Sequence, residues 1–123
     1  MIAKRLLLGL VAIIALSAIV GTGAIAYFNN TEKTTLYYGD GCSHCERVEQ
    51  YIKNTKLDDQ FIIDRKEVFN NKKNAETLLK KMIACKLPNT TEVSVPVLVD
   101  QGKCFLGDVD IIKYLSEKAA IRK

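Results

Sequence analysis

Apolar and polar residues change pattern along the chain, and the changes predict a small α/β domain behind a long apolar segment. Residues 6–27 carry no charge. From residue 34 onward, short runs rich in β-branched and aromatic residues, typical of strands, alternate with stretches of helical periodicity. In chain order we expect a strand at Thr34–Tyr38, a helix from about Cys42 to Lys56, a strand at Phe61–Val68, a helix from Asn70 and Asn71 to about Cys85, strands at Val95–Val99 and Lys103–Leu106, and a helix from Asp108 to about Ala120.

Each predicted helix has one apolar stripe that would face a core. The stripes are Cys45, Val48, Tyr51, Ile52 and Thr55; then Ala75, Leu78, Leu79, Met82 and Ile83; then Val109, Ile112, Tyr114 and Leu115. Asp58 and Asp59 are expected to end the first helix, and Asp108 to cap the last. The turn Asp100-Gln101-Gly102 would join the last two strands into an antiparallel hairpin.

The uncharged run from Leu6 to Tyr27 would span roughly 33 Å as a helix, enough to cross a bilayer. Lys4 and Arg5 before it favour a cytoplasmic N-terminus and an extracytoplasmic domain. We therefore predict a single-pass membrane anchor at residues 1–28, a tether at 29–33 and the domain at 34–123. A cleaved signal peptide is the alternative, since Ala24-Ile25-Ala26 fits a cleavage site, and both alternatives export the domain.

Cys42-Ser43-His44-Cys45 carries the chemistry of the chain. The pair follows a predicted strand and the turn Gly39-Asp40-Gly41, and it opens a predicted helix. Unpaired N–H groups and the partial positive charge of a helix start stabilise a thiolate, which is the nucleophilic form of cysteine. Cys45 lies one turn later on the same face, where it could resolve a mixed disulfide formed at Cys42. The pattern indicates a thiol–disulfide redox centre.

Two other interpretations of this motif stay open. A purely structural disulfide between cysteines one turn apart would close almost no loop entropy. Alternatively, Cys42, His44 and Cys45 could hold copper or zinc in a membrane-tethered metal carrier, although tetrahedral zinc usually takes ligand pairs from separate segments, and His44 is the only histidine.

The net charge of +4 does not indicate a further function. Lys4 and Arg5 account for part of it, so the remaining Lys and Arg residues exceed the 14 acidic residues by only two. Such a mixed surface, with no basic patch interleaved with aromatic residues, gives no indication of nucleic-acid binding.

The element order with Cys-x-x-Cys between the first strand and helix resembles the thioredoxin fold in its short glutaredoxin-like form. The resemblance covers about residues 34–118 and also rests on Val95-Pro96 and Gly107-Asp108. It implies a four-stranded mixed sheet flanked by helices, with Cys42 as nucleophile and Cys45 as resolving residue. It further implies a cis Val95–Pro96 bond beside the dithiol and substrate contacts at Val95, Pro96, Gly107 and Asp108.

The dipeptide Ser43-His44 departs from the glutaredoxin pattern and is expected to tune the centre. A histidine just before the second cysteine resembles protein disulfide isomerase and the periplasmic thiol oxidases. An imidazole there would stabilise the Cys42 thiolate and make the centre more oxidising than thioredoxin. Asp108 places a carboxylate where a glutathione backbone would approach, which argues against glutathione as the working substrate.

Cys85 and Cys104 complete an even number of cysteines, which an oxidising compartment would pair. A structural disulfide between them would contribute on the order of 3 kcal/mol. A second redox pair and two free thiols are the alternatives.

The resulting prediction is a membrane-anchored thiol–disulfide oxidoreductase that needs no cofactor and no metal. Its partners would be protein or small-molecule thiols and disulfides, together with a redox partner protein that can itself be membrane-bound. Oxidase, isomerase and reductase share these residues, so the direction of electron flow stays open. A redox-inert domain that recruits a partner through the same surface is a further alternative.

Overall fold

The computed structural model describes residues 33–88 and 92–121, which belong to the unit Glu32–Lys123. The predicted membrane anchor and most of the predicted tether therefore lie outside the described residues. Among the helices of the described part, none is long and apolar enough to span a bilayer.

The described elements follow the predicted order, with one addition. They are β1 (Thr34–Tyr38), α2 (Ser43–Asn54), the 3₁₀ turn η1 (Leu57–Asp59), β2 (Ile63–Glu67), α3 (Lys72–Ala84), β3 (Val97–Asp100), β4 (Lys103–Leu106) and α4 (Asp108–Ile121). The strands form a mixed sheet in the order β2-β1-β3-β4, in which β1 and β2 are parallel and the other neighbours antiparallel. This mixed α/β arrangement is compatible with a thioredoxin-like domain.

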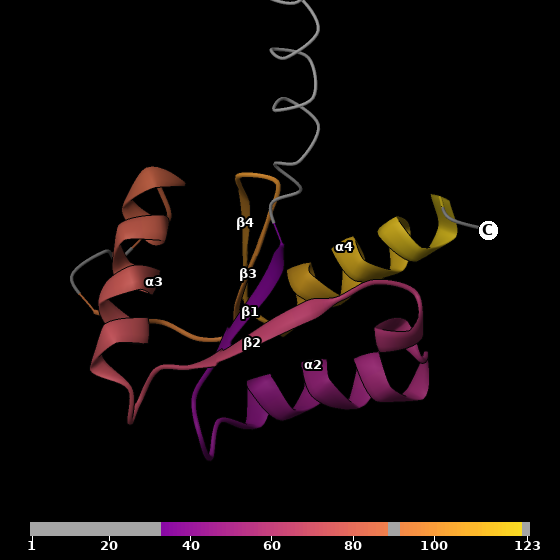
Figure 1. Cartoon of the computed structure of the whole chain (residues 1–123), viewed down its shortest axis with the longest axis horizontal. Coiled ribbons are helices and arrows are strands. Elements are labelled where there is room, and N and C mark those ends of the chain that lie inside the picture. The colour runs from indigo at the N-terminus through magenta and orange to yellow at the C-terminus, as the bar shows by residue number, and fades with distance from the viewer. Residues whose placement is uncertain (1–32, 89–91, 122–123) are drawn as a thin grey trace, which may run out of the picture. The chain divides into compact units, whose positions relative to one another are not determined.

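The helices cover both faces of the sheet (Figure 1), with α2 and α4 on one face and α3 on the other. Consecutive residues of β1 point into different cores, because successive side chains of a strand lie on opposite faces of the sheet. Leu36 packs with Val48 and Ile52 of α2 and with residues of α4, whereas Tyr37 packs with residues of α3. Because β1 lies inside the sheet and is buried from both faces, it holds the turn at its C-terminal end in a fixed position.

The strand and helix ends differ from the prediction where a local backbone feature intervenes. α2 ends at Asn54, before Asp58 and Asp59, because Lys56 adopts a left-handed conformation with φ 52° that no helix continues. β2 begins only at Ile63, since Gln60 and Phe61 donate their N–H groups to Leu57. β3 begins at Val97, after the proline, which has no N–H to donate to a strand partner.

Each of the three predicted stripes needs a correction. On α2, Thr55 is exposed, because it is the C-cap residue after the helix ends. On α4 the fully buried residues are Ile111 and Leu115, while Val109 is 74% exposed. Asp108 is the first helical residue rather than the cap, and Ile112 and Tyr114 of the predicted stripe are partly buried against the same core. On α3, Leu78 and Met82 are buried as predicted, but Ile83 is 57% exposed.

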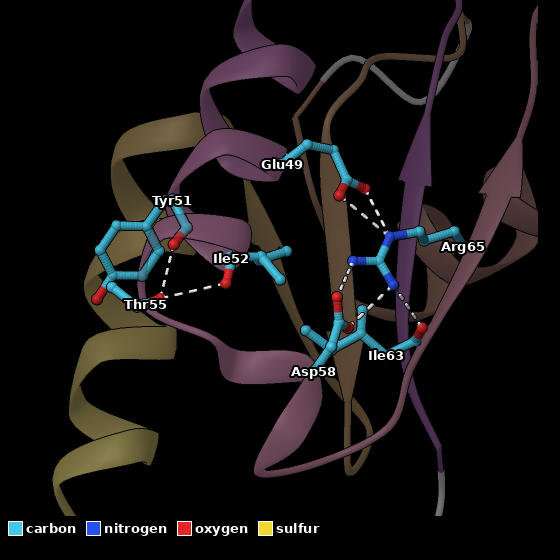
Figure 2. Close-up of polar contacts among 7 residues, drawn as sticks. All are labelled: Glu49, Tyr51, Ile52, Thr55, Asp58, Ile63 and Arg65. Atoms are coloured by element: carbon cyan, nitrogen blue, oxygen red, sulfur yellow. Dashed lines mark hydrogen bonds and ion pairs between the residues drawn. The ribbon is translucent and has the colours of Figure 1, made fainter.

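Arg65 fixes α2 against the edge of the sheet (Figure 2). From β2 its Nε lies 2.8 Å from Glu49 of α2, and its terminal nitrogens reach both carboxylate oxygens of Asp58 in η1. Hydrogen bonds to Asp58, and then to Glu49, raise the pKa of Arg65 above its usual range. At the end of α2, the Thr55 hydroxyl donates to the Tyr51 carbonyl at 2.6 Å. These contacts hold the helix that begins at the dithiol.

Candidate functional site

The turn between β1 and α2 brings the Cys-x-x-Cys motif to the end of the sheet. Gly41 has φ 75°, a conformation that favours glycine, and the Cys42 N–H donates to the Gly39 carbonyl at 3.2 Å. Phe69 lies directly over Gly39, where an added Cβ would collide with its ring. The Asn70 side chain donates to Asp40 at 3.2 Å. The loop after β2 therefore braces the turn that presents Cys42.

Cys42 is the N-cap residue of α2, so the helix begins at Ser43, one residue after the predicted start. Its Sγ accepts a hydrogen bond from the Cys45 N–H at 3.2 Å. An oxygen at an N-cap satisfies one of the unpaired N–H groups of the first turn, and here a sulfur takes that place. The same contact, with the positive end of the helix, stabilises negative charge on this sulfur when the pair is reduced.

The two sulfurs are joined in a disulfide, with the Cα atoms 5.2 Å apart. Cys42 is half-buried, whereas Cys45 is only 3% exposed. A substrate therefore has access to Cys42 first, and Cys45 lies behind it within bonding distance. This geometry suits a nucleophile and a resolving thiol.

Ser43 and His44 are exposed on the first turn of α2, and His44 is tied to α4. His44 Nδ1 lies 2.8 Å from Oδ1 of Asp108. The other carboxylate oxygen of Asp108, Oδ2, lies 3.1 Å from Arg47 Nε. One carboxylate thus joins the start of α4 to two cationic or protonatable groups of α2.

The Nδ1 atom of His44 also lies 2.6 Å from a terminal nitrogen of Arg47. A ring nitrogen cannot donate to a carboxylate and accept from a guanidinium at once. We assign a proton to His44 Nδ1 that is donated to Asp108, because an ionised carboxylate can only accept. Arg47 already reaches the second oxygen of that carboxylate. The His44 hydrogen bond, assisted by the charge of Arg47, holds the pKa of Asp108 below its usual value, so it is ionised at neutral pH.

The predicted substrate-binding residues meet at the same end of the sheet. The Val95–Pro96 peptide bond is cis, and Pro96 is fully buried. The Gly107 N–H donates to the Pro96 carbonyl at 2.9 Å, and Gly107 has φ 86°. Since Asp108 follows Gly107 directly, hydrogen bonds connect the proline segment, the start of α4 and the dithiol turn of α2. Their role in substrate binding remains a prediction.

Cys85 and Cys104 form a second disulfide at a different place, between the C-cap of α3 and the edge strand β4. Their Cα atoms are 6.0 Å apart. Cys85 Sγ lies 3.8 Å from the Gly102 carbonyl oxygen, and Cys104 Sγ lies 3.8 Å from that of Lys81. Carbonyl oxygens and the negative end of a helix disfavour a thiolate, whereas Cys42 faces an N–H group. The two disulfides therefore have opposite electrostatic surroundings.

The described residues contain no group of three or more His, Cys, Asp or Glu side chains placed to hold a metal ion. A surface pocket of about 470 Å³ lies between β4 and α4, and its lining includes Cys104, Phe105 and Tyr114 but none of the dithiol residues. The dithiol is therefore presented on the surface rather than inside this pocket.

Sequence reasoning missed two parts of the site. Arg47 stands three residues after His44 on one helix face, a spacing that could have indicated a shared partner. Phe69 lies far from the motif in sequence, and no local pattern indicates that its ring covers Gly39.

Comparison with protein-family models and with curated protein sequences finds no match for this chain.

Proposed function

We propose that this protein is a thioredoxin-like thiol–disulfide oxidoreductase whose redox centre is Cys42-Ser43-His44-Cys45. The observation that carries the proposal is the cap geometry: an accessible sulfur accepts an N–H at a helix start, and a buried cysteine is its disulfide partner. No other cysteine among the described residues has surroundings that favour a thiolate in this way.

In the reductive direction, the Cys42 thiolate attacks one sulfur of a substrate disulfide, and the other substrate sulfur leaves as a thiolate. Cys45 then loses its proton and attacks the Cys42 sulfur of the mixed disulfide, which releases the second substrate thiolate. The substrate gains two electrons and two protons, and the protein becomes the Cys42–Cys45 disulfide. The oxidative direction reverses each step, and the redox partner decides which prevails.

The proposal includes location and partners. The apolar run at residues 6–27 supports a single-pass anchor with an extracytoplasmic domain. Substrates would then be thiols and disulfides of exported proteins or small molecules, and electrons would come from or go to a partner protein at the membrane.

Graded reduction tests whether Cys42–Cys45 is the redox-active pair. The purified domain is equilibrated in thiol–disulfide buffers of decreasing potential, alkylated, and analysed by mass spectrometry. We expect Cys42 and Cys45 to be reduced first and Cys85 and Cys104 only at a potential lower by at least about 60 mV, which corresponds to about 100-fold in the exchange equilibrium.

Reduction of both pairs at one potential would contradict the assignment of distinct roles and would favour a relay between them. Elemental analysis of the reduced, anaerobically purified protein tests the alternative function. A stoichiometric copper or zinc ion that survives dialysis would support the metal carrier instead.

A further inference from the structure

The basic side chains in the first turns of α2 are paired with a carboxylate of the same chain, that of Asp108. Asp108 is only 8% exposed, and each of its carboxylate oxygens faces one basic side chain of α2, His44 or Arg47. The carboxylate also stands in the first turn of α4, where unpaired N–H groups favour an anion. The Asp108 carboxylate thus occupies the position to which His44, Arg47 and the helix N–H groups would otherwise attract an anionic ligand.

The remaining charges of the two turns that carry the dithiol and Asp108 are acidic. Within residues 39–47 and 107–111, His44 and Arg47 are the only basic residues, and both contact Asp108. Asp40 in the turn before Cys42, Glu46 in the first turn of α2 and Asp110 in the first turn of α4 are all exposed. Within these two turns, an anionic substrate approaching Cys42 therefore meets exposed carboxylates, while both basic side chains are paired with Asp108.

We infer that Asp108 is a specificity-determining residue that makes the Cys42–Cys45 centre select against anionic thiols and disulfides and in favour of neutral or cationic ones. The inference rests on the proposed function, which it deepens by naming the charge of the substrate. Like charges slow the encounter of two molecules, and opposite charges accelerate it. The centre is thereby directed toward cysteines in neutral or basic peptide segments and away from glutathione-like molecules.

Three small disulfides of different charge test the inference. They are hydroxyethyl disulfide, which is neutral, oxidised glutathione, which is anionic, and cystamine, which is cationic. The reduced full chain is mixed with each, and the rate of Cys42–Cys45 oxidation is measured. The readout is the rate with each charged probe divided by the rate with the neutral probe, so that a general change in Cys42 reactivity cancels.

Asp108→Asn keeps the size of the side chain and releases His44 and Arg47. We expect its ratio for oxidised glutathione to rise by about threefold to tenfold and its ratio for cystamine to fall, as expected for one unit charge a few ångströms from the path of the probe. Asp110→Asn is the matched control, because it removes the same charge from the same turn without a contact to either cation. Its ratios should change in the same direction but by clearly less than those of Asp108→Asn, because Asp110 is exposed and its loss releases no cation.

The wild-type protein supplies an independent measurement. Raising the ionic strength to about 1 M should increase its oxidised-glutathione ratio and lower its cystamine ratio, because salt screens both effects. Ratios that do not respond to salt, or that change equally in Asp108→Asn and Asp110→Asn, would overturn the inference while leaving the proposed function intact. Failure of the wild type to react with the neutral probe would instead refute the proposed function itself, and the inference with it.

Discussion

Replacement of Cys42 by serine is expected to reduce disulfide exchange to the uncatalysed level, a loss of at least about 10³-fold by comparison with the removal of other covalent nucleophiles. Replacement of Cys45 by serine should have a different result. The Cys42 thiolate still attacks a substrate disulfide, but nothing resolves the product, so a mixed disulfide accumulates. Non-reducing electrophoresis and mass spectrometry of the adducts distinguish the two variants.

The control for this pair is Cys85→Ser combined with Cys104→Ser. These cysteines lie at the end of α3 and in β4, away from the dithiol turn, so the double variant should retain exchange activity at reduced stability. Accumulation of adducts through Cys104 or Cys85 in the Cys45→Ser protein, rather than through Cys42, would contradict the assigned roles.

Loss of the Asp100 carboxylate is expected to have the largest effect on stability. Asp100 is only 1% exposed and accepts hydrogen bonds from Thr34 at 3.0 Å, from Tyr114 at 2.6 Å and from the Lys118 ammonium. Asp100→Ala leaves the Lys118 ammonium, whose side chain is 19% exposed, without its carboxylate, and only the Thr34 hydroxyl at 3.0 Å still accepts from it. We expect the free energy of unfolding to fall by about 3–5 kcal/mol, a large part of the stability of a domain of this size.

The matched control is Asp64→Ala, which removes a half-exposed aspartate whose ion pair with Lys66 spans 3.8 Å. It should cost less than about 1 kcal/mol. Urea unfolding followed by circular dichroism compares the two, and Asp100→Asn provides a milder variant if the alanine protein does not fold. Equal losses of unfolding free energy in Asp100→Ala and Asp64→Ala would show that the buried cluster around Asp100 stabilises the domain no more than a partly exposed ion pair does.

The same cluster makes stability depend on pH at both extremes. Burial raises the pKa of Asp100, but hydrogen bonds from Lys118 and Tyr114 and the charge of Lys118 outweigh it, so the net pKa is lowered. Its contribution is therefore present above about pH 4 and disappears as the pH falls through the folded-state pKa. Burial and the Asp100 hydrogen bond raise the pKa of Tyr114 to about 12. That contribution is present below about pH 10 and is lost as the pH rises toward 12.

Local sequence patterns predicted most of the helices and strands, because the residue types and spacing within each segment are typical of one kind of element. The strand at Thr34–Tyr38 is confirmed, and the 3.6-residue spacing of Cys45, Val48 and Ile52 is confirmed by their burial. The errors arise where tertiary contacts decide. On α4, both Val109 and Ile111 are apolar, and only packing against the core decides that Ile111 is buried and Val109 exposed.

The buried ionic cluster was equally invisible in the sequence. Asp100 was predicted as a turn residue, because aspartate beside Gln101 and Gly102 is typical of a turn, but the structure makes it the last residue of β3. Its partners Thr34 and Lys118 are separated from it by 66 and 18 residues, so no local spacing connects them. The dithiol itself was predictable, because its chemistry lies within four consecutive residues behind a strand.

The stabilisation of a thiolate at Cys42 by the start of α2 is the claim on which the account depends. It is tested by the pH dependence of alkylation of Cys42 in the reduced Cys45→Ser protein, with Cys85 and Cys104 left paired. The account predicts a midpoint at least about one pH unit below that of an ordinary cysteine, which is about 8.5. A midpoint at or above the ordinary value would contradict it.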